Sequence, residues 1–123
     1  MNELIKTKSV MNCPKSFVLA VNDTLNVIGG KWKISIIASL LQSKMRFKDL
    51  QEVIVKITPR MLSKELKELE LNGVVNRIVQ PSKPVLIEYE LTESGKQLSE
   101  VIDSIIDWGL NHRSVTINTI KKD

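Results

Sequence analysis

Leucines recur at helical spacing in the middle of the chain, within TPRMLSKELKELELNG at residues 58–73. Three of them share one helix face, which must therefore be buried: Leu62, Leu66 and Leu69. Thr58 offers a hydroxyl to the free amides of a first helical turn, and Pro59 suits the first helical position, where no amide hydrogen is needed. Asn72 and Gly73 favour the left-handed conformation that ends a helix. This segment predicts one helix with both ends defined by the sequence.

The opposite face of this predicted helix is polar and basic. Its residues repeat at i, i+3, i+4 and i+7: Arg60, Ser63, Lys64 and Lys67. Such a stripe is typical of an anion-binding surface, and also of an ordinary solvated helix face. Which interpretation holds depends on the structure predicted for the segments on either side.

Upstream, apolar residues crowd together over residues 17–28 and are interrupted by Asn22-Asp23, a pair that suits a helix N-cap. We expect a short helix from about Asp23 to Ile28, ended by Gly29-Gly30. Residues 31–42 contain no helix breaker. They carry apolar side chains at helical spacing: Trp32, Ile36, Ile37, Leu40 and Leu41. This pattern predicts a core helix from Lys31 to Gln42.

A further short helix is predicted just before the leucine-rich one. Ser43 to Arg46 has the composition of a polar turn, and residues 47–53 place Phe47, Leu50 and then Ile54 at i, i+3 and i+7. Val55 to Ile57 is left as a brief connector. Two helices joined by a few residues, the second of them basic on its outer face, form the helix-turn-helix pattern.

After Gly73 the hydrophobic period changes from 3.6 to 2. Residues 74–80 and 85–91 are rich in β-branched and aromatic residues, and residues 81–84, Pro-Ser-Lys-Pro, cannot continue a strand. The pattern predicts a hairpin, and a hairpin directly after a helix-turn-helix is a wing. Arg77 on its first strand and Lys83 at its tip can reach phosphate or the minor groove, or can belong to an ordinary solvated turn.

The last predicted helix begins at Thr92, a second N-cap residue. Its apolar residues occupy more than one side: Leu98, Val101, Ile102, Ile105, Ile106, Trp108 and Leu110. This surface is broader than a small domain can cover, so we expect a homodimer. His112 lies near the expected end of the helix, where an interfacial role or an interaction with the helix dipole is favoured over catalysis. We divide the chain into an arm (1–12), a domain (13–114) and a tail (115–123).

Composition narrows the function classes. The 123 residues with a formal charge of +4 fit one domain that suits a polyanionic partner. With one cysteine, no membrane-length apolar run and no signal-peptide pattern, we expect a reduced cytoplasmic protein without disulfides. No carboxylate pair, catalytic triad order, phosphate-binding loop or metal-ligand spacing is present. We therefore expect no enzyme, no metal and no cofactor.

These segments together resemble the HxlR-type family of bacterial winged helix-turn-helix transcriptional regulators. The resemblance covers roughly Asp23 to His112 and is carried by these matches: Gly29-Gly30-Lys31-Trp32-Lys33, Arg46-Phe47-Lys48-Asp49-Leu50, Ile57 to Leu62 with Leu66 to Glu70 and Gly73-Val74-Val75, and Tyr89-Glu90-Leu91-Thr92 with Gly95 and Leu98. It implies an α+β, mostly helical fold: a winged helix-turn-helix with flanking N- and C-terminal dimerisation helices.

The resemblance also implies a sequence-specific DNA-binding regulator that acts as a homodimer. Residues 58–71 would enter the major groove, and the wing at residues 80–84 would meet the flanking backbone or minor groove. The candidate DNA-binding residues are Arg46, Lys48, Thr58, Pro59, Arg60, Ser63, Lys64, Lys67, Arg77 and Lys83. The alternative from another class is a winged-helix module that binds a protein instead of DNA.

Two regulatory interpretations stay open. Some similar regulators carry a sensing cysteine followed by proline before the first helix, and Cys13-Pro14 matches that dipeptide, although it lies several residues further from Gly29-Gly30. Cys13 is thus either a redox sensor or an inert, partly buried thiol. An unknown small-molecule effector can also bind between the dimer helices and the winged domain. Three aromatic residues are candidates to line that space or to belong to the core: Phe17, Trp32 and Trp108.

Overall fold

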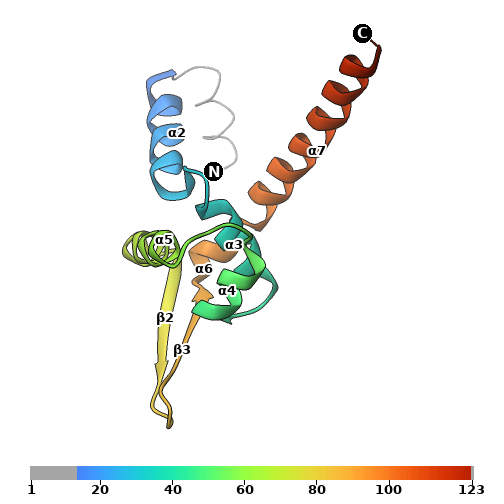
Figure 1. Ribbon diagram of the computed structural model, residues 1–123. Coiled ribbons are helices and arrows are strands. Elements are labelled where there is room, and N and C mark those ends of the chain that lie inside the picture. Colours follow the sequence, from blue (N-terminus) through green and yellow to red (C-terminus); the bar gives the residue numbers. More distant parts are fainter. Residues whose placement is uncertain (1–13, 123) are drawn as a thin grey trace.

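The computed structural model describes residues 14–122 and consists mainly of helices around one small sheet (Figure 1). The elements follow one another as α2 (Pro14–Ile28), α3 (Lys33–Gln42), β1 (Met45–Arg46), α4 (Phe47–Val53), α5 (Pro59–Leu71), β2 (Val75–Gln80), β3 (Leu86–Leu91), α6 (Glu93–Lys96) and α7 (Ser99–Lys122). The antiparallel sheet has the strand order β1-β3-β2. This arrangement confirms the predicted mostly helical winged helix-turn-helix.

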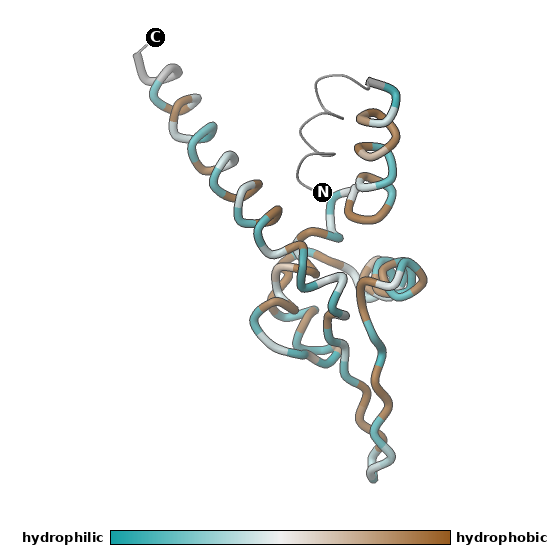
Figure 2. The backbone as a smooth tube through the Cα atoms, turned by 180° about the vertical axis from the view of Figure 1, so that it is seen from behind, coloured by the Kyte–Doolittle hydropathy of each residue, from teal (hydrophilic) through white to brown (hydrophobic). Residues whose placement is uncertain are grey.

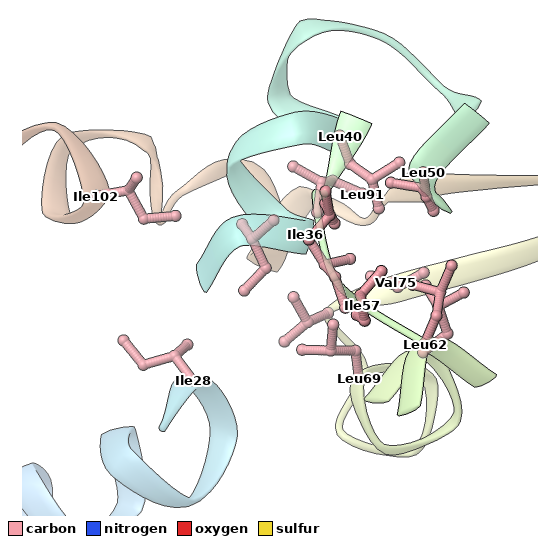
Figure 3. Close-up of a cluster of buried hydrophobic side chains, with 14 residues drawn as sticks. Ile28, Ile36, Leu40, Leu50, Ile57, Leu62, Leu69, Val75, Leu91 and Ile102 are labelled. Atoms are coloured by element: carbon pink, nitrogen blue, oxygen red, sulfur yellow. The ribbon is translucent and has the colours of Figure 1, made fainter. Parts of the chain in front are cut away.

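The core lies between α3, α4, α5 and the base of the sheet (Figure 3). Its largest fully buried side chains are Ile36, Ile37, Leu50, Leu62, Leu66, Leu69, Val75 and Ile102. Burying each such side chain contributes roughly 1.5–3 kcal/mol. The leucine stripe of α5 is thus covered as its spacing predicted, which leaves the opposite face of α5 outward.

Helix α2 differs from the predicted short helix. It begins at Pro14 and passes through Asn22-Asp23 without a break. Both residues are exposed on the helix surface, and the Thr24 hydroxyl donates a hydrogen bond to the carbonyl of Ala20, at 2.8 Å, inside the helix. Asn and Asp therefore act here as ordinary surface residues, because neither proline nor glycine interrupts the segment. The helix ends at Ile28, as expected, and Gly30 has a φ of +94°.

Three smaller predictions about element boundaries were wrong. Residues 45–46 form strand β1 instead of part of a turn, because they pair with Glu88 and Tyr89 of β3. The core helix α3 starts at Lys33, two residues later than expected. The predicted single helix after Thr92 is divided into α6 and α7 by a turn at Gln97-Leu98, where Leu98 packs against the core.

Helix α7 continues well past the expected end at His112. It runs to Lys122, so the boundary placed after residue 114 falls inside a continuous helix. His112 consequently lies outside the last turn and is not a helix-dipole partner; its ring instead stacks on Trp108, with centroids 4.7 Å apart. Figures 1 and 2 show α2 and α7 projecting from the body on the side opposite the wing.

Candidate nucleic-acid interface

The N-terminus of α5 is fixed by the residues that the sequence singled out. The Met61 amide donates a hydrogen bond to the Thr58 hydroxyl at 3.1 Å, and Pro59 occupies the first helical position. At the other end, the amide of Asn72 donates to the Glu68 carbonyl at 3.0 Å, and Gly73 takes a φ of +74°. The predicted cap and stop are both confirmed, so the helix presents a defined set of outward residues.

The outward face of α5 is free of contacts with the core. Leu62, Leu66 and Leu69 are at most 1% exposed, whereas the candidate residues at the helix surface are all exposed: Arg60, Ser63, Lys64 and Lys67. Leu71, 78% exposed, continues the same face at its C-terminal end. The basic stripe is therefore one accessible surface about two turns long. Thr58 and Pro59, also exposed, stand at its beginning.

An acidic flank of α5 pairs with α3, and the sequence analysis missed this. Lys33 is 8% exposed, and its Nζ lies 2.7 Å from Glu65 Oε2 and donates a hydrogen bond to Glu68 Oε2 at 2.5 Å. Burial disfavours the ammonium, but the hydrogen bonds and charges of both carboxylates outweigh it and raise the pKa of Lys33. The hydrogen bond and charge of Lys33, with a smaller effect of Lys64, lower the pKa of Glu68. Lys33 and Glu68 are therefore charged and paired at neutral pH.

The wing is a hairpin of β2 and β3 that extends from the body (Figure 1). Arg77 is exposed and pairs in register with Tyr89, and Lys83 is exposed at the tip. The tip is closed by the Ser82 hydroxyl, which donates to the Pro84 carbonyl at 2.7 Å, and the Lys83–Pro84 peptide is cis. The two basic candidates of the hairpin thus lie at different distances from the body, Arg77 along β2 and Lys83 at the tip.

The remaining candidates lie at the start of α4. Arg46 caps this helix: its amide donates to Asp49 Oδ2 at 3.1 Å, and its Nε lies 3.7 Å from the same oxygen. Lys48 is exposed in the first turn. In β1, Arg46 also pairs in register with Glu88. The structure brings the α5 candidates together on one face, whereas the Arg46 side chain lies next to the carboxylate of Asp49.

Helices α2 and α7 expose apolar side chains along most of their length. On α2 they include Phe17, Val18, Leu19, Val21 and Leu25, and on α7 they include Val101, Ile105, Ile106, Trp108, Leu110, Val115 and Ile117. So many exposed apolar side chains on two helices are unusual on a monomer. It agrees with the surplus that the sequence pattern indicated.

A cavity of about 400 Å³ lies where α2 meets the body. It is lined by Asp23, Thr24, Val27, Ile28, Val74, Ser94, Gln97 and Leu98. None of the three aromatic candidates lines it: Trp32 packs against the core, Phe17 is exposed on α2, and Trp108 borders a separate hollow on α7. The predicted effector site between the dimer helices and the winged domain therefore stays a prediction.

Residues 14–122 contain neither a membrane-spanning helix nor a cluster of metal ligands. None of the helices in this part of the chain is long and apolar enough to cross a membrane. The same residues contain no group of three or more acidic, histidine or cysteine side chains arranged to hold a metal ion. Cys13 lies outside the described residues, as does the predicted arm at residues 1–12.

Comparison with known proteins gives one consistent result. A family model described as HxlR-like helix-turn-helix matches residues 27–116. The HTH-type transcriptional regulator YtcD of Bacillus subtilis (strain 168) is 44% identical over 98 residues, which cover 80% of this chain and 78% of that protein.

Solved structures agree with the family model. The redox regulator HypR in its reduced form superposes with a TM-score of 0.76 at 38% identity, covering 80% of this chain and 98% of that chain. The reduced form of the transcriptional regulator YodB from B. subtilis gives 0.66 at 38% identity, covering 71% and 85%. Together with the exposed basic stripe on α5 and the wing, these matches show that the chain belongs to the HxlR-like helix-turn-helix family of DNA-binding transcriptional regulators.

Proposed function

We propose that the protein regulates transcription as a homodimer that places α5 of each subunit in the major groove of an operator. The observation that carries the proposal is the outward face of α5. It presents Arg60, Lys64 and Lys67 to solvent on a helix whose opposite face is fixed in the core. Arginine and lysine are the side chains that contact phosphates and guanine edges most often.

The basic residues divide by role. Arg60, Ser63 and Lys64 lie in the first half of α5, the part of a recognition helix that contacts base edges, so they set sequence preference. Lys67, Thr58 and Pro59 border this region. Arg77, Lys83, Lys48 and, more weakly, Arg46 meet the DNA backbone around it. Arg46 is the weakest candidate because Asp49 and Glu88 are its neighbours.

The homodimer forms through the apolar surfaces of α2 and α7. Burial of these side chains against a second copy removes them from water, and a two-fold axis then relates the two recognition helices. Such a dimer binds two half-sites about 10 bp apart, or a multiple of that, in a near-palindrome. A DNA-binding regulator works where the chromosome is, so we place the protein in the cytoplasm.

Selection of bound duplexes from a random pool tests the proposal, followed by fluorescence anisotropy on the selected operator. If about six phosphates are engaged, the affinity falls by roughly 10³ between 50 and 200 mM salt. Arg60→Ala should cost about 1–3 kcal/mol on the operator and relax the preference at one position. Lys83→Ala should weaken binding to all sequences about equally and lower the salt slope by about one.

Lys96→Ala is the matched control for these variants, because it removes one exposed positive charge from α6, outside the proposed interface. It should leave the affinity unchanged. Sedimentation of the wild type tests the dimer, and Ile105→Asp, which puts a charge on the exposed apolar face of α7, should yield monomers. Selected sites without inverted symmetry, or a monomeric wild type at micromolar concentration, would contradict the dimeric arrangement.

Redox control is a second candidate, favoured by two of the compared structures. HypR is described as a redox regulator, and YodB has also been solved after diamide treatment. The candidate in this chain is Cys13, which precedes Pro14 in the sequence. Because the chain has one cysteine, a disulfide can form only between subunits or with a small thiol.

A further inference from the structure

Lys33 occupies a position that is unfavourable for a lysine on two counts. It is the only charged residue among the buried side chains of residues 15–118. It is also the first residue of α3, and the positive end of a helix dipole repels a cation. A buried charge in such a place must be compensated by specific partners.

Both partners of Lys33 come from the recognition helix. Glu65 and Glu68 lie three residues apart on α5, with side chains 14% and 41% exposed, and both place a carboxylate oxygen within 2.7 Å of Lys33 Nζ. We call Lys33, Glu65 and Glu68 the ion triad. It joins the first turn of α3 to the middle of α5.

The ion triad supplies a directional constraint that the apolar core lacks. Leu62, Leu66 and Leu69 hold α5 against the body, but contacts among aliphatic side chains tolerate small rotations and shifts of a helix. Hydrogen bonds and ion pairs require defined distances and angles. Two of them, from one buried ammonium to two successive turns, oppose rotation of α5 about its own axis.

The ion triad also shapes the charge that DNA meets. At 100° per residue, Glu65 and Glu68 lie on the flank of α5 between the leucine face and the basic stripe, and Glu68 is one turn from Lys64. Without a counter-ion, these two negative charges would lie within a Debye length of the phosphates that the stripe contacts. Lys33 neutralises part of this charge from inside the protein.

We propose that Lys33 is a positioning residue for DNA recognition, which sets the rotation of α5 in the groove through Glu65 and Glu68. The inference rests on the proposed function, since it requires α5 to contact bases. A helix rotated by a few tens of degrees still meets phosphates but misaligns its base contacts. Loss of the ion triad should therefore reduce discrimination between sequences more than it reduces binding to DNA in general.

The experiment compares two dissociation constants for each variant, one for the selected operator and one for a scrambled duplex of equal length. Their ratio is the discrimination. Lys33→Met keeps the length of the side chain and removes its charge, and it should lower the discrimination about tenfold, the effect of losing one good base contact. Lys33→Arg, which retains the charge and two donors, should keep most of it.

Ile37→Val is the stability control. It removes one buried methylene from the same helix, where Ile37 is fully buried, and it should leave the ratio unchanged in folded protein. If Lys33→Met does not fold, Glu68→Gln gives the same test, because this partly exposed side chain can lose its charge without opening the core. Glu68→Gln should lower the ratio about threefold.

The outcomes separate the two proposals. A wild type that retards no duplex contradicts the proposed function. A wild type that discriminates, with Lys33→Met and Glu68→Gln variants that are folded and discriminate equally well, shows that the ion triad serves stability alone and overturns the inference. A fall in discrimination that Lys33→Arg restores and Ile37→Val does not reproduce supports it.

Discussion

Gly95 in α6 lies against the base of the wing, and replacing it with alanine tests how closely the chain is packed there. A Cβ at this position would stand 2.4 Å from the carbonyl oxygen of Val74, about 1 Å short of ordinary contact. That carbonyl already accepts a hydrogen bond from the Thr92 amide at 3.0 Å, and the Thr92 hydroxyl, which donates to the Gly73 carbonyl at 2.7 Å, lies 3.2 Å from it. A methyl group therefore pushes apart the two segments that these bonds join.

Whether Gly95→Ala raises or lowers the stability depends on two contributions: the higher helix propensity of alanine and the cost of overpacking. Glycine to alanine in an unobstructed helix would raise stability by about 1 kcal/mol. Overpacking costs about 1–3 kcal/mol, and each neutral hydrogen bond that is broken costs about 1 kcal/mol more. Atoms of the Leu91 side chain at 3.1 and 3.2 Å from the new Cβ restrict relaxation. We expect Gly95→Ala to lower the free energy of unfolding by about 2 kcal/mol.

Urea unfolding followed by circular dichroism measures this change, at one protein concentration because the stability of a dimer depends on it. With an m-value of about 2 kcal/mol/M, the midpoint should fall by about 1 M. Ser94→Ala changes the exposed neighbour and should stay within about 0.5 kcal/mol of wild type. A Gly95→Ala variant at least as stable as wild type would show that the close approach to Val74 is not a constraint.

Three further predictions concern the stability of the recognition helix and the redox regulation of DNA binding. Thr58→Ala removes the acceptor of the Met61 amide and should cost about 1 kcal/mol in urea unfolding, whereas Thr58→Ser should cost less; equal losses would contradict the capping role. Because Lys33 lowers the pKa of Glu68 below its ordinary value near 4.5, the stability from this pair is complete above that pH and is lost as pH falls through the folded-state pKa. The free energy of unfolding of Glu68→Gln should therefore fall less steeply than that of wild type as the pH is lowered. An equally steep fall in the two proteins would count against the pairing. Operator binding by wild type and Cys13→Ser, measured before and after mild diamide, should differ only in the oxidised samples if the thiol is a sensor; identical behaviour assigns Cys13 to structure.

An element could be predicted from the sequence where its own residues determine where it begins and ends. Thr58-Pro59 and Asn72-Gly73 define α5 without reference to the rest of the fold, and the change of period after Gly73 defines the wing. The excess of apolar residues on α7 is likewise visible within that one segment, whereas the segment of α2 predicted only a shorter helix from about Asp23. In each case the determining interaction lies within a few residues.

Pairings between distant segments could not be predicted. Strand β1 exists only because Met45-Arg46 lies beside β3, about 40 positions later in the chain, and the two residues alone have the composition of a turn. The ion triad joins Lys33 to residues 32 and 35 positions away. A lysine at the start of an apolar helix and two glutamates beside a leucine stripe were visible, but only the packing of α3 on α5 connects them.

Strand β1 has a mechanical consequence for the length of DNA that one subunit covers. Arg46 belongs at once to the sheet and to the first turn of α4, so the helix-turn-helix and the wing share a backbone junction. This junction restrains movement of the base of the wing relative to the helix-turn-helix. Helix α2, in contrast, leaves the helix-turn-helix through Gly29-Gly30. We therefore expect related operators to differ in the spacer between half-sites while the width of each half-site footprint stays the same.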